Sequence, residues 1–175
     1  MRNLYLIRHG TPDFPKGIKQ CIGKTEIDIG QVGKIEAKNL RDCFKKCNIE
    51  AIYASPLIRC IHTAEIIADG KLEVKVKNGL EEIYMGHWEG IPLKQIKKRV
   101  DALVRFEGAL KEIMKNTSGD IICVAHAGVN CAFIAKTIGK DIKTSRAIRQ
   151  PCGCYNKFEF DGENFIAVEV GCLPK

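Results

Sequence analysis

Leu4-Tyr5-Leu6-Ile7-Arg8-His9-Gly10 begins as an apolar, strand-like run and ends abruptly in a guanidinium, an imidazole and a glycine. Buried strands rarely end in two such polar side chains. In open α/β sheets, ligands bind outside the carboxyl ends of the strands. The stretch therefore predicts a first strand whose carboxyl end carries functional residues. The alternative is a strand end whose polar residues have no special role, because a three-residue motif also recurs by chance.

The rest of the chain alternates between strand-like and helix-like patterns. Apolar residues at steps of three and four predict helices over 33–47, 57–68, 103–113 and about 127–138. Apolar or alternating runs predict strands at 51–54, 72–76 and 121–125, and a closing hairpin over 155–170 that turns at Asp161-Gly162. The order β-α-β-α-β-loop-α-β-α-β-β is typical of an α/β protein, here a three-layer α/β/α sandwich on a largely parallel sheet. No repeat or linker interrupts it, so we expect one domain over residues 1–175.

Composition and charge restrict the class of protein. The chain is 45% hydrophobic and 28% charged, and no apolar run approaches the length of a bilayer span, so we expect no membrane association. Its net charge of +7 suits either nucleic acid or small anions. The lysines are scattered rather than gathered into a basic stripe, which argues against a nucleic-acid partner.

The cysteines indicate a reducing compartment. Nine cysteines are an odd number with no CxxC pair, and Cys43, Cys47, Cys123 and Cys131 fall among apolar positions, where a thiol behaves as a small hydrophobe. The first seven residues are too short for the apolar region of a signal peptide. We therefore expect a cytoplasmic protein.

Two later motifs bring more polar residues to the same edge of the predicted sheet. Ser55-Pro56 predicts an N-cap followed by proline at the first helical position, which places Arg59 in the first turn of a helix. The most apolar strand, 121–125, ends at His126. Guanidinium groups repel metals, whereas their forked donors match phosphate oxygens. The two arginines, His9 and His126 therefore predict a phosphate site without a metal.

Irregular stretches are expected to border this site. Residues 11–17 contain two prolines and a glycine and predict a loop that leaves the sheet edge. Residues 80–90 break every period and carry acids and aromatic side chains, as loops at functional sites commonly do. Residues 17–25 look like a phosphate-binding P-loop. They have one residue too many between the glycines, no strand before and no helix directly after, which argues against nucleotide binding.

Four motifs in order resemble those of the histidine phosphatase superfamily, also called phosphoglycerate mutase-like. They are Arg8-His9-Gly10, the run from Ser55 to Ala64, the run from Leu80 to Gly90, and the run from Val124 to Val129. The likeness extends from the first strand to the C-terminal hairpin and implies the phosphoglycerate mutase-like fold. Within the superfamily, residues 21–26 and 150–154 resemble the α-ribazole phosphatase-like branch.

The resemblance implies a metal-independent phosphomonoesterase that needs no cofactor. His9 would attack phosphorus and form a phosphohistidine, while Arg8, Arg59 and His126 hold the non-bridging oxygens. Glu82 matches the general acid of the family. In the alternative interpretation Glu82, like Glu81 and Glu89, is a surface acid. The implied partner is a small phosphorylated metabolite, such as α-ribazole 5′-phosphate, and the protein is expected to be a monomer or a homodimer.

The chain also departs from many relatives on the substrate side of the site. Pro15 stands where they carry an asparagine that holds the phosphate, so Thr11 or a backbone amide is expected to take its place. A Pro-Gly-Glu-Ser-like stretch before the helix near residue 100 is missing. The candidate substrate-binding residues, if the loop over 14–25 folds above the phosphate, are Phe14, Thr25, Tyr84 and Trp88. The alternative is that these aromatic residues belong to the core.

Other polar residues are assigned no chemistry. His62 and His87 occupy variable motif positions and are expected to be structural or exposed, and Cys152 with Cys154 lacks a second cysteine pair to complete a zinc site. Three other functions stay open: a broad-specificity sugar or small-metabolite phosphatase, a phosphoglycerate mutase, and a phospho-ligand-binding protein without catalysis. The mutase is disfavoured by the short chain, and the binding protein by Glu82, because holding phosphate requires no proton donor.

Overall fold

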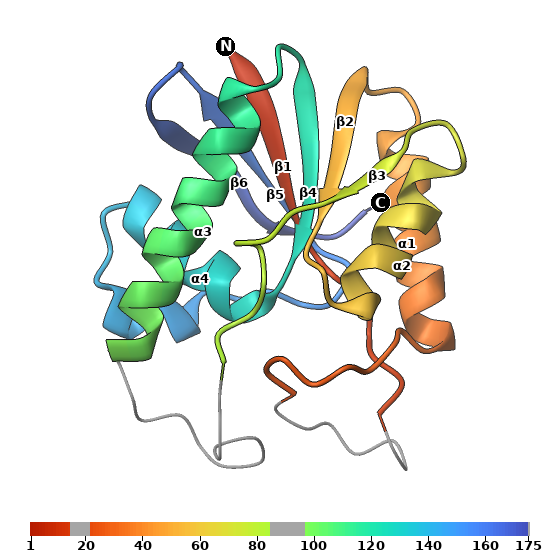
Figure 1. Ribbon diagram of the computed structural model, residues 1–175, viewed down its shortest axis with the longest axis horizontal. Helices are drawn as coiled ribbons and strands as arrows, with labels where there is room; N and C mark the ends of the chain where they lie inside the picture. Colours follow the sequence, from red (N-terminus) through yellow and green to blue (C-terminus); the bar gives the residue numbers. More distant parts are fainter. Residues whose placement is uncertain (15–21, 85–96, 175) are drawn as a thin grey trace.

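A six-stranded sheet forms the centre of the molecule. The computed structural model describes residues 1–14, 22–84 and 97–174, with side chains in the last range from residue 102 onward. The strand order is β3-β2-β4-β1-β5-β6 (Figure 1). The strands are β1 (Arg2–Arg8), β2 (Ile49–Ala54), β3 (Val74–Val76), β4 (Asp120–Ala125), β5 (Tyr155–Phe160) and β6 (Phe165–Cys172). Strands β1 to β4 are parallel to one another, β5 pairs antiparallel with β1, and β6 pairs antiparallel with β5, which confirms the predicted, largely parallel sheet.

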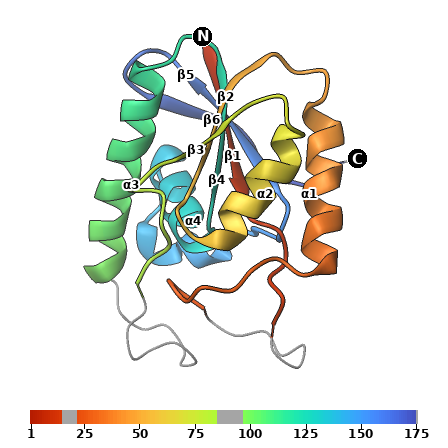
Figure 2. The same cartoon turned by 45° about the vertical axis from the view of Figure 1, so that its right-hand side comes forward.

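Helices cover both faces of this sheet. On one face lie α1 (Gln31–Phe44) and α2 (Ile58–Ala68), and on the other α3 (Lys97–Lys115), α4 (Ala127–Thr137) and the 3₁₀ helix η3 (Ile142–Ala147) (Figures 1 and 2). Each face has its own hydrophobic cluster, because apolar side chains of the strands point alternately to both layers. The three-layer α/β/α sandwich predicted from the sequence is therefore confirmed.

The strands that lead to the site are anchored by deep burial. In β4, the side chains from Ile121 to Ala125 are at most 1% exposed, as in a parallel strand covered on both faces. Phe133 of α4 packs against the rings of Phe106, Phe158 and Phe165 at centroid distances of 5.1–6.0 Å. Burying one such ring contributes roughly 1.5–3 kcal/mol. The strand ends that carry the site therefore extend from a tightly packed core.

The structure corrects two details of the sequence interpretation. Helix α2 begins at Ile58 with Leu57 as N-cap, so Ser55 is not the cap and Pro56 is not the first helical residue. The reason is that Ser55 still follows the extended line of β2, where its backbone N–H donates to the Val124 carbonyl at 3.0 Å. In addition, α1 ends at Phe44, and Cys43 and Cys47 are exposed rather than part of the core.

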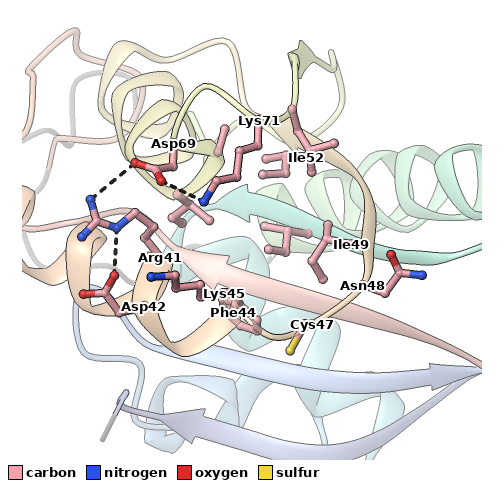
Figure 3. Close-up of a pocket in the computed structure, with 14 residues that line it drawn as sticks. Arg41, Asp42, Phe44, Lys45, Cys47, Asn48, Ile49, Ile52, Asp69 and Lys71 are labelled. Carbon is pink, nitrogen blue, oxygen red and sulfur yellow. Dashed lines mark hydrogen bonds and ion pairs between the residues drawn. The ribbon is translucent and has the colours of Figure 1, made fainter.

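A cavity of about 450 Å³ lies between the C-terminal ends of α1 and α2 (Figure 3). It adjoins Ile49, the first residue of β2, and so lies at the amino end of the parallel strands. The charged groups at its rim pair with one another, since Asp69 accepts from Arg41 at 3.5 Å and from Lys71 at 3.0 Å. Ligands of open α/β sheets bind at the opposite, carboxyl edge.

No helix among the described residues is long and apolar enough to span a membrane.

Candidate active site

The carboxyl ends of β1, β2 and β4 meet at one edge of the sheet. The backbone N–H of His9, just after β1, donates to the carbonyl of Ala125, the last residue of β4, at 3.0 Å. The imidazoles of His9 and His126 lie 5.2 Å apart between ring centroids, and Arg59 Nη2 is 3.3 Å from His126 Nδ1. The structure thus brings together the residues that the sequence places at this edge. All of them except the half-buried Arg8 are buried.

A close contact between two glycines sets the turn that follows His9. A Cβ at Gly10 would lie 2.5 Å from the carbonyl oxygen of Gly33, and a Cβ at Gly33 would lie 2.4 Å from the carbonyl oxygen of Thr11. Only glycine allows the backbones to approach this closely. The Gly10 N–H donates to Thr63 Oγ1 at 3.1 Å. The turn is thereby held between the beginning of α1 and the first turns of α2.

The turn over residues 150–154 supports the same strand end from another side. The backbone N–H of Arg8 donates to the Cys154 carbonyl at 3.0 Å, and Gly153 N–H donates to the His9 carbonyl at 3.3 Å. The Arg8 guanidinium donates through Nη1 to the Gln150 carbonyl. Both the backbone and the side chain of Arg8 are therefore fixed by this turn.

His9 is a neutral imidazole with one free ring nitrogen. Its Nδ1 lies 2.8 Å from the Gly10 carbonyl oxygen, which only accepts hydrogen bonds, so Nδ1 carries the proton and Nε2 the lone pair. Burial, together with the charges of Arg59 and Arg8, lowers the pKa of His9 to about 3, against the opposing hydrogen bond to Gly10. The unprotonated Nε2 is the form of imidazole that can act as a nucleophile.

Each of the two guanidinium groups has a donor that makes no hydrogen bond to the described residues. Arg59 is fully buried and donates through Nη2 to the Gly23 carbonyl at 2.7 Å and through Nη1 to the Thr25 carbonyl at 2.8 Å. The Nε atoms of Arg8 and Arg59 are buried and have no partner among the described residues. Within those residues, neither guanidinium forms an ion pair with a carboxylate. One buried and one half-buried cation, each with a buried Nε donor that has no partner among the described residues, fit an anion such as phosphate.

Glu82 and Glu81 point to different parts of the structure. The Glu82 carboxylate accepts hydrogen bonds from the backbone N–H groups of Ile83 at 2.9 Å, Gly128 at 3.0 Å and Val129 at 3.2 Å. It therefore lies on the N-terminus of α4, directly after His126. A carboxylate there also stabilises the helix, which is the purely structural interpretation of Glu82.

Glu81 lies in an ion pair with α3. Its Oε2 pairs with Arg105 and accepts from the Gly79 N–H at 2.7 Å. Burial raises the pKa of Glu81, but the backbone hydrogen bonds and Arg105 outweigh this effect and lower it overall. These contacts give Glu81 a structural role. Glu82 is the acid that lies next to the segment following His126.

Other residues singled out in the sequence have separate surroundings. Thr11 donates from its backbone and its hydroxyl to the Glu36 carboxylate at 2.7 and 2.9 Å, so its hydroxyl proton is engaged in this conformation. Tyr84 is 58% exposed and is not a core residue, and Phe14 is half-buried. His62 pairs with Asp28 at 2.7 Å in the structural role predicted for it. Pro15, His87, Trp88 and Glu89 lie outside the described residues.

Several residues at the site were not singled out by sequence reasoning. Asn130, one turn after His126, is fully buried, and neither side-chain amide atom has a partner within the described ranges. Ser55 Oγ lies 2.8 Å from His126 Nε2. Side chains that meet from distant segments leave no local signal in the sequence. In the part of the chain that the structure describes, no group of three or more histidine, cysteine or acidic residues could hold a metal ion.

This α/β fold carries the buried Arg59, the half-buried Arg8 and a neutral histidine at its strand ends, an arrangement whose charge fits an anion. The chain belongs to the histidine phosphatase superfamily, branch 1, whose profile matches residues 4–104 and 100–172, and it is a phosphatase of this superfamily.

Known proteins similar to this chain agree with that family. The uncharacterized phosphatase PhoE of Bacillus subtilis is 27% identical over 181 residues, which cover 94% of this chain and 92% of PhoE. The adenosylcobalamin/alpha-ribazole phosphatase of Escherichia coli is 24% identical, over 95% of this chain and 94% of that protein. Among solved structures, YhfR of Bacillus stearothermophilus has a TM-score of 0.89 at 21% identity, covering 99% and 98% of the two chains. The phosphoglycerate mutase-like fold is thereby established.

Proposed function

We propose that this phosphatase hydrolyses phosphomonoesters without a metal, through a phosphohistidine at His9. The observation that carries the proposal is the neutral His9 with a lone pair on Nε2, beside two guanidinium groups whose buried Nε donors have no partner among the described residues. Such fixed donors stabilise the charge that develops on a transferring phosphoryl group. They supply the positive charge that a metal ion would otherwise bring.

In the first half of the proposed reaction, His9 Nε2 attacks phosphorus. A P–N bond forms while the ester P–O bond breaks, Arg8 and Arg59 donate to the non-bridging oxygens, and His126 lies beside Arg59. The oxygen of the leaving alcohol takes a proton from Glu82, because an alkoxide is a poor leaving group.

In the second half, water attacks the phosphohistidine. The Glu82 carboxylate accepts the proton of that water, the P–N bond breaks, and its electron pair returns to His9 Nε2. The products are the alcohol and inorganic phosphate. Glu82 thus acts first as acid and then as base, and its position next to the α4 N-terminus keeps it within the same site in both steps.

We further propose a small phosphorylated metabolite as substrate, with α-ribazole 5′-phosphate as the first compound to test. The loop over 21–26 and the turn over 150–154 support this choice, as does the similarity to the Escherichia coli enzyme. A cytoplasmic location belongs to the same proposal and is supported by the nine cysteines without a CxxC pair.

The test combines a substrate panel with trapping of the intermediate. Rates are measured with α-ribazole 5′-phosphate, phosphoserine, glycerol phosphate, sugar phosphates and 3-phosphoglycerate, each with and without EDTA. Rapid acid-free quenching with ³²P-labelled substrate is expected to give labelled protein in the wild type and none in His9→Ala. Vanadate, which mimics the five-coordinate transition state, is expected to inhibit.

Distinct results separate the alternatives. Loss of activity in EDTA that zinc or magnesium restores would overturn the metal-independent mechanism. Phosphoryl exchange between phosphoglycerates without net release of phosphate would identify a mutase. If kcat/KM for α-ribazole 5′-phosphate is no better than for glycerol phosphate or sugar phosphates, the specific substrate is wrong and a broad-specificity phosphatase remains.

A further inference from the structure

A hydrogen-bonded chain of buried side chains leads away from His126. His126 Nδ1 is 3.3 Å from Arg59 Nη2, and His126 Nε2 is 2.8 Å from Ser55 Oγ. Cys60 Sγ lies 3.4 Å from the same Nε2 and 3.5 Å from the Ala125 carbonyl oxygen. The side chains of all four polar residues, Ser55, Arg59, Cys60 and His126, are completely buried.

The donors and acceptors in this series of hydrogen bonds permit only one direction of proton donation. A guanidinium only donates, so His126 Nδ1 must accept from Arg59. Since burial holds His126 neutral, with its pKa well below the ordinary value, the ring proton must lie on Nε2. That N–H donates to Ser55 Oγ. Two donors then converge on this oxygen, because the Leu57 N–H also approaches it at 3.4 Å.

The remaining protons continue the chain to the backbone. With both lone pairs of Ser55 Oγ engaged, its own hydroxyl proton can turn toward the Cys60 thiol, which lies 3.4 Å from the same His126 Nε2. The Cys60 S–H points to the Ala125 carbonyl, which also accepts the backbone N–H of His9 at 3.0 Å. Every proton is used once. The chain runs from Arg59 to the strand end that carries His9.

We propose that Ser55 and Cys60 are positioning residues that hold His126 as the neutral Nε2–H tautomer and thereby orient the Arg59 guanidinium. The contribution to catalysis rests on the proposed function, because it assumes that Arg59 holds the phosphoryl oxygens. In this tautomer Nδ1 presents a lone pair to Arg59. In the resting site His126 therefore fixes Arg59, whose Nε has no partner in the part of the chain that the structure describes.

The tautomer is tested by NMR on protein labelled with ¹⁵N-histidine, without any substrate. The His126 resonances are assigned from their loss in His126→Asn. In the wild type we expect a pyridine-type Nδ1 and a pyrrole-type Nε2 whose proton is protected from exchange. In Ser55→Ala this proton loses its oxygen acceptor and keeps only the Cys60 thiol at 3.4 Å, so its signal is expected to shift and to exchange faster with solvent. A wild-type His126 that carries its proton on Nδ1, or an unchanged signal in Ser55→Ala, would overturn the proposal.

Catalysis supplies a second measurement, with a matched control. Ser55→Ala and Cys60→Ala are expected to lower kcat/KM by about tenfold, since small displacements of a group that binds the transition state have large effects on rate. Cys60→Ser keeps a donor and is expected to recover most of the loss. Cys123 is an equally buried thiol in β4 whose pKa is raised by burial alone, so Cys123→Ala is expected to leave both the His126 spectrum and kcat/KM unchanged.

The two measurements separate the failure of this inference from the failure of the proposed function. If the NMR spectra change as expected but kcat/KM does not, Ser55 and Cys60 are not positioning residues. If the wild type has no phosphatase activity on any ester, the proposed function is wrong, and the tautomer is still decided by the spectra.

Discussion

The Oε2 atom of Glu82 accepts a hydrogen bond from the backbone nitrogen of Gly128 at 3.0 Å, in the space that a side chain at residue 128 would occupy. A Cβ at residue 128 would lie 2.5 Å from Glu82 Oε1. Gly128 is the second residue of α4 and follows His126 by two positions. The glycine after the second histidine is therefore what lets the carboxylate lie on the helix N-terminus, next to the buried histidines.

Replacing Gly128 with alanine tests this relationship directly. Because the new methyl group would displace the Glu82 carboxylate, we expect Gly128→Ala to slow the hydrolysis of alkyl phosphates on the order of 100-fold, the size of a lost general acid. A nitrophenyl ester, whose leaving group needs little protonation, should lose far less. Gly108 in α3 has open space around it, so Gly108→Ala serves as the control and should keep full activity. Equal losses on both kinds of ester would contradict the assignment.

The choice between the two adjacent acids gives a second prediction. Glu82→Gln removes the proton that the leaving group needs and is expected to reduce kcat most for alkyl esters. Glu81→Gln instead weakens the pair with Arg105 and the contact with Gly79, so it should lower the free energy of unfolding while leaving the dependence on the leaving group unchanged. Rates over a series of esters, together with urea unfolding of both variants, decide which of the two acids protonates the leaving group. A leaving-group effect in Glu81→Gln alone would reverse the two roles.

Patterns along the chain were sufficient to predict the fold. The apolar runs of β1 and β4 and the helical period of α1 each lie within one element, and the polar residues that follow the strands mark the carboxyl edge. The prediction of Ser55 as a helix cap was wrong because its hydroxyl is used by His126, 71 residues further on. A local motif does not reveal such a partner.

For a similar reason, the hydrogen-bond partners within the site could not be predicted from the sequence. Arg59 donates to the carbonyl groups of Gly23 and Thr25, and backbone carbonyls have no signature in the sequence. Thr11 was predicted to bind phosphate, and its role stays a prediction. Its contact with Glu36 depends on how α1 packs against the turn after His9. Such pairings follow from tertiary packing, and the motifs indicate only which segments meet.

The third prediction concerns the two arginines. An ammonium group cannot reproduce the two directed bonds of Arg59 to Gly23 and Thr25, so Arg59→Lys should both weaken catalysis and loosen residues 22–26. Arg8→Lys should weaken catalysis without this effect, since Arg8 donates to Gln150 instead. Hydrogen exchange measured by mass spectrometry reports the loop, and kcat/KM the site. Faster exchange over 22–26 in both variants, or in neither, would show that Arg59 does not hold the loop.

The last prediction follows from the buried, neutral state of His9. Its pKa falls from an ordinary value of 6.5 to about 3 on folding. Between these values the unfolded chain binds a proton that the folded protein does not, so stability falls as the pH falls from about 7 toward 3. For this one group, the free energy of unfolding should drop by about 2 kcal/mol between pH 7 and pH 5. His126, whose pKa is also lowered by burial, adds a loss of the same sign.

His9→Gln isolates this contribution, because glutamine is of similar size and does not titrate. Urea unfolding at pH 7 and pH 5 should show that the variant loses about 2 kcal/mol less than the wild type over this interval, while the carboxylates contribute equally to both proteins. His62, half-exposed and paired with Asp28, supplies the matched control for the exchange of histidine for glutamine, and His62→Gln is unfolded at the same two pH values. If His9→Gln and the wild type lose the same stability between the two pH values, His9 is not held neutral by the fold, and its free Nε2 is not the resting state of the enzyme.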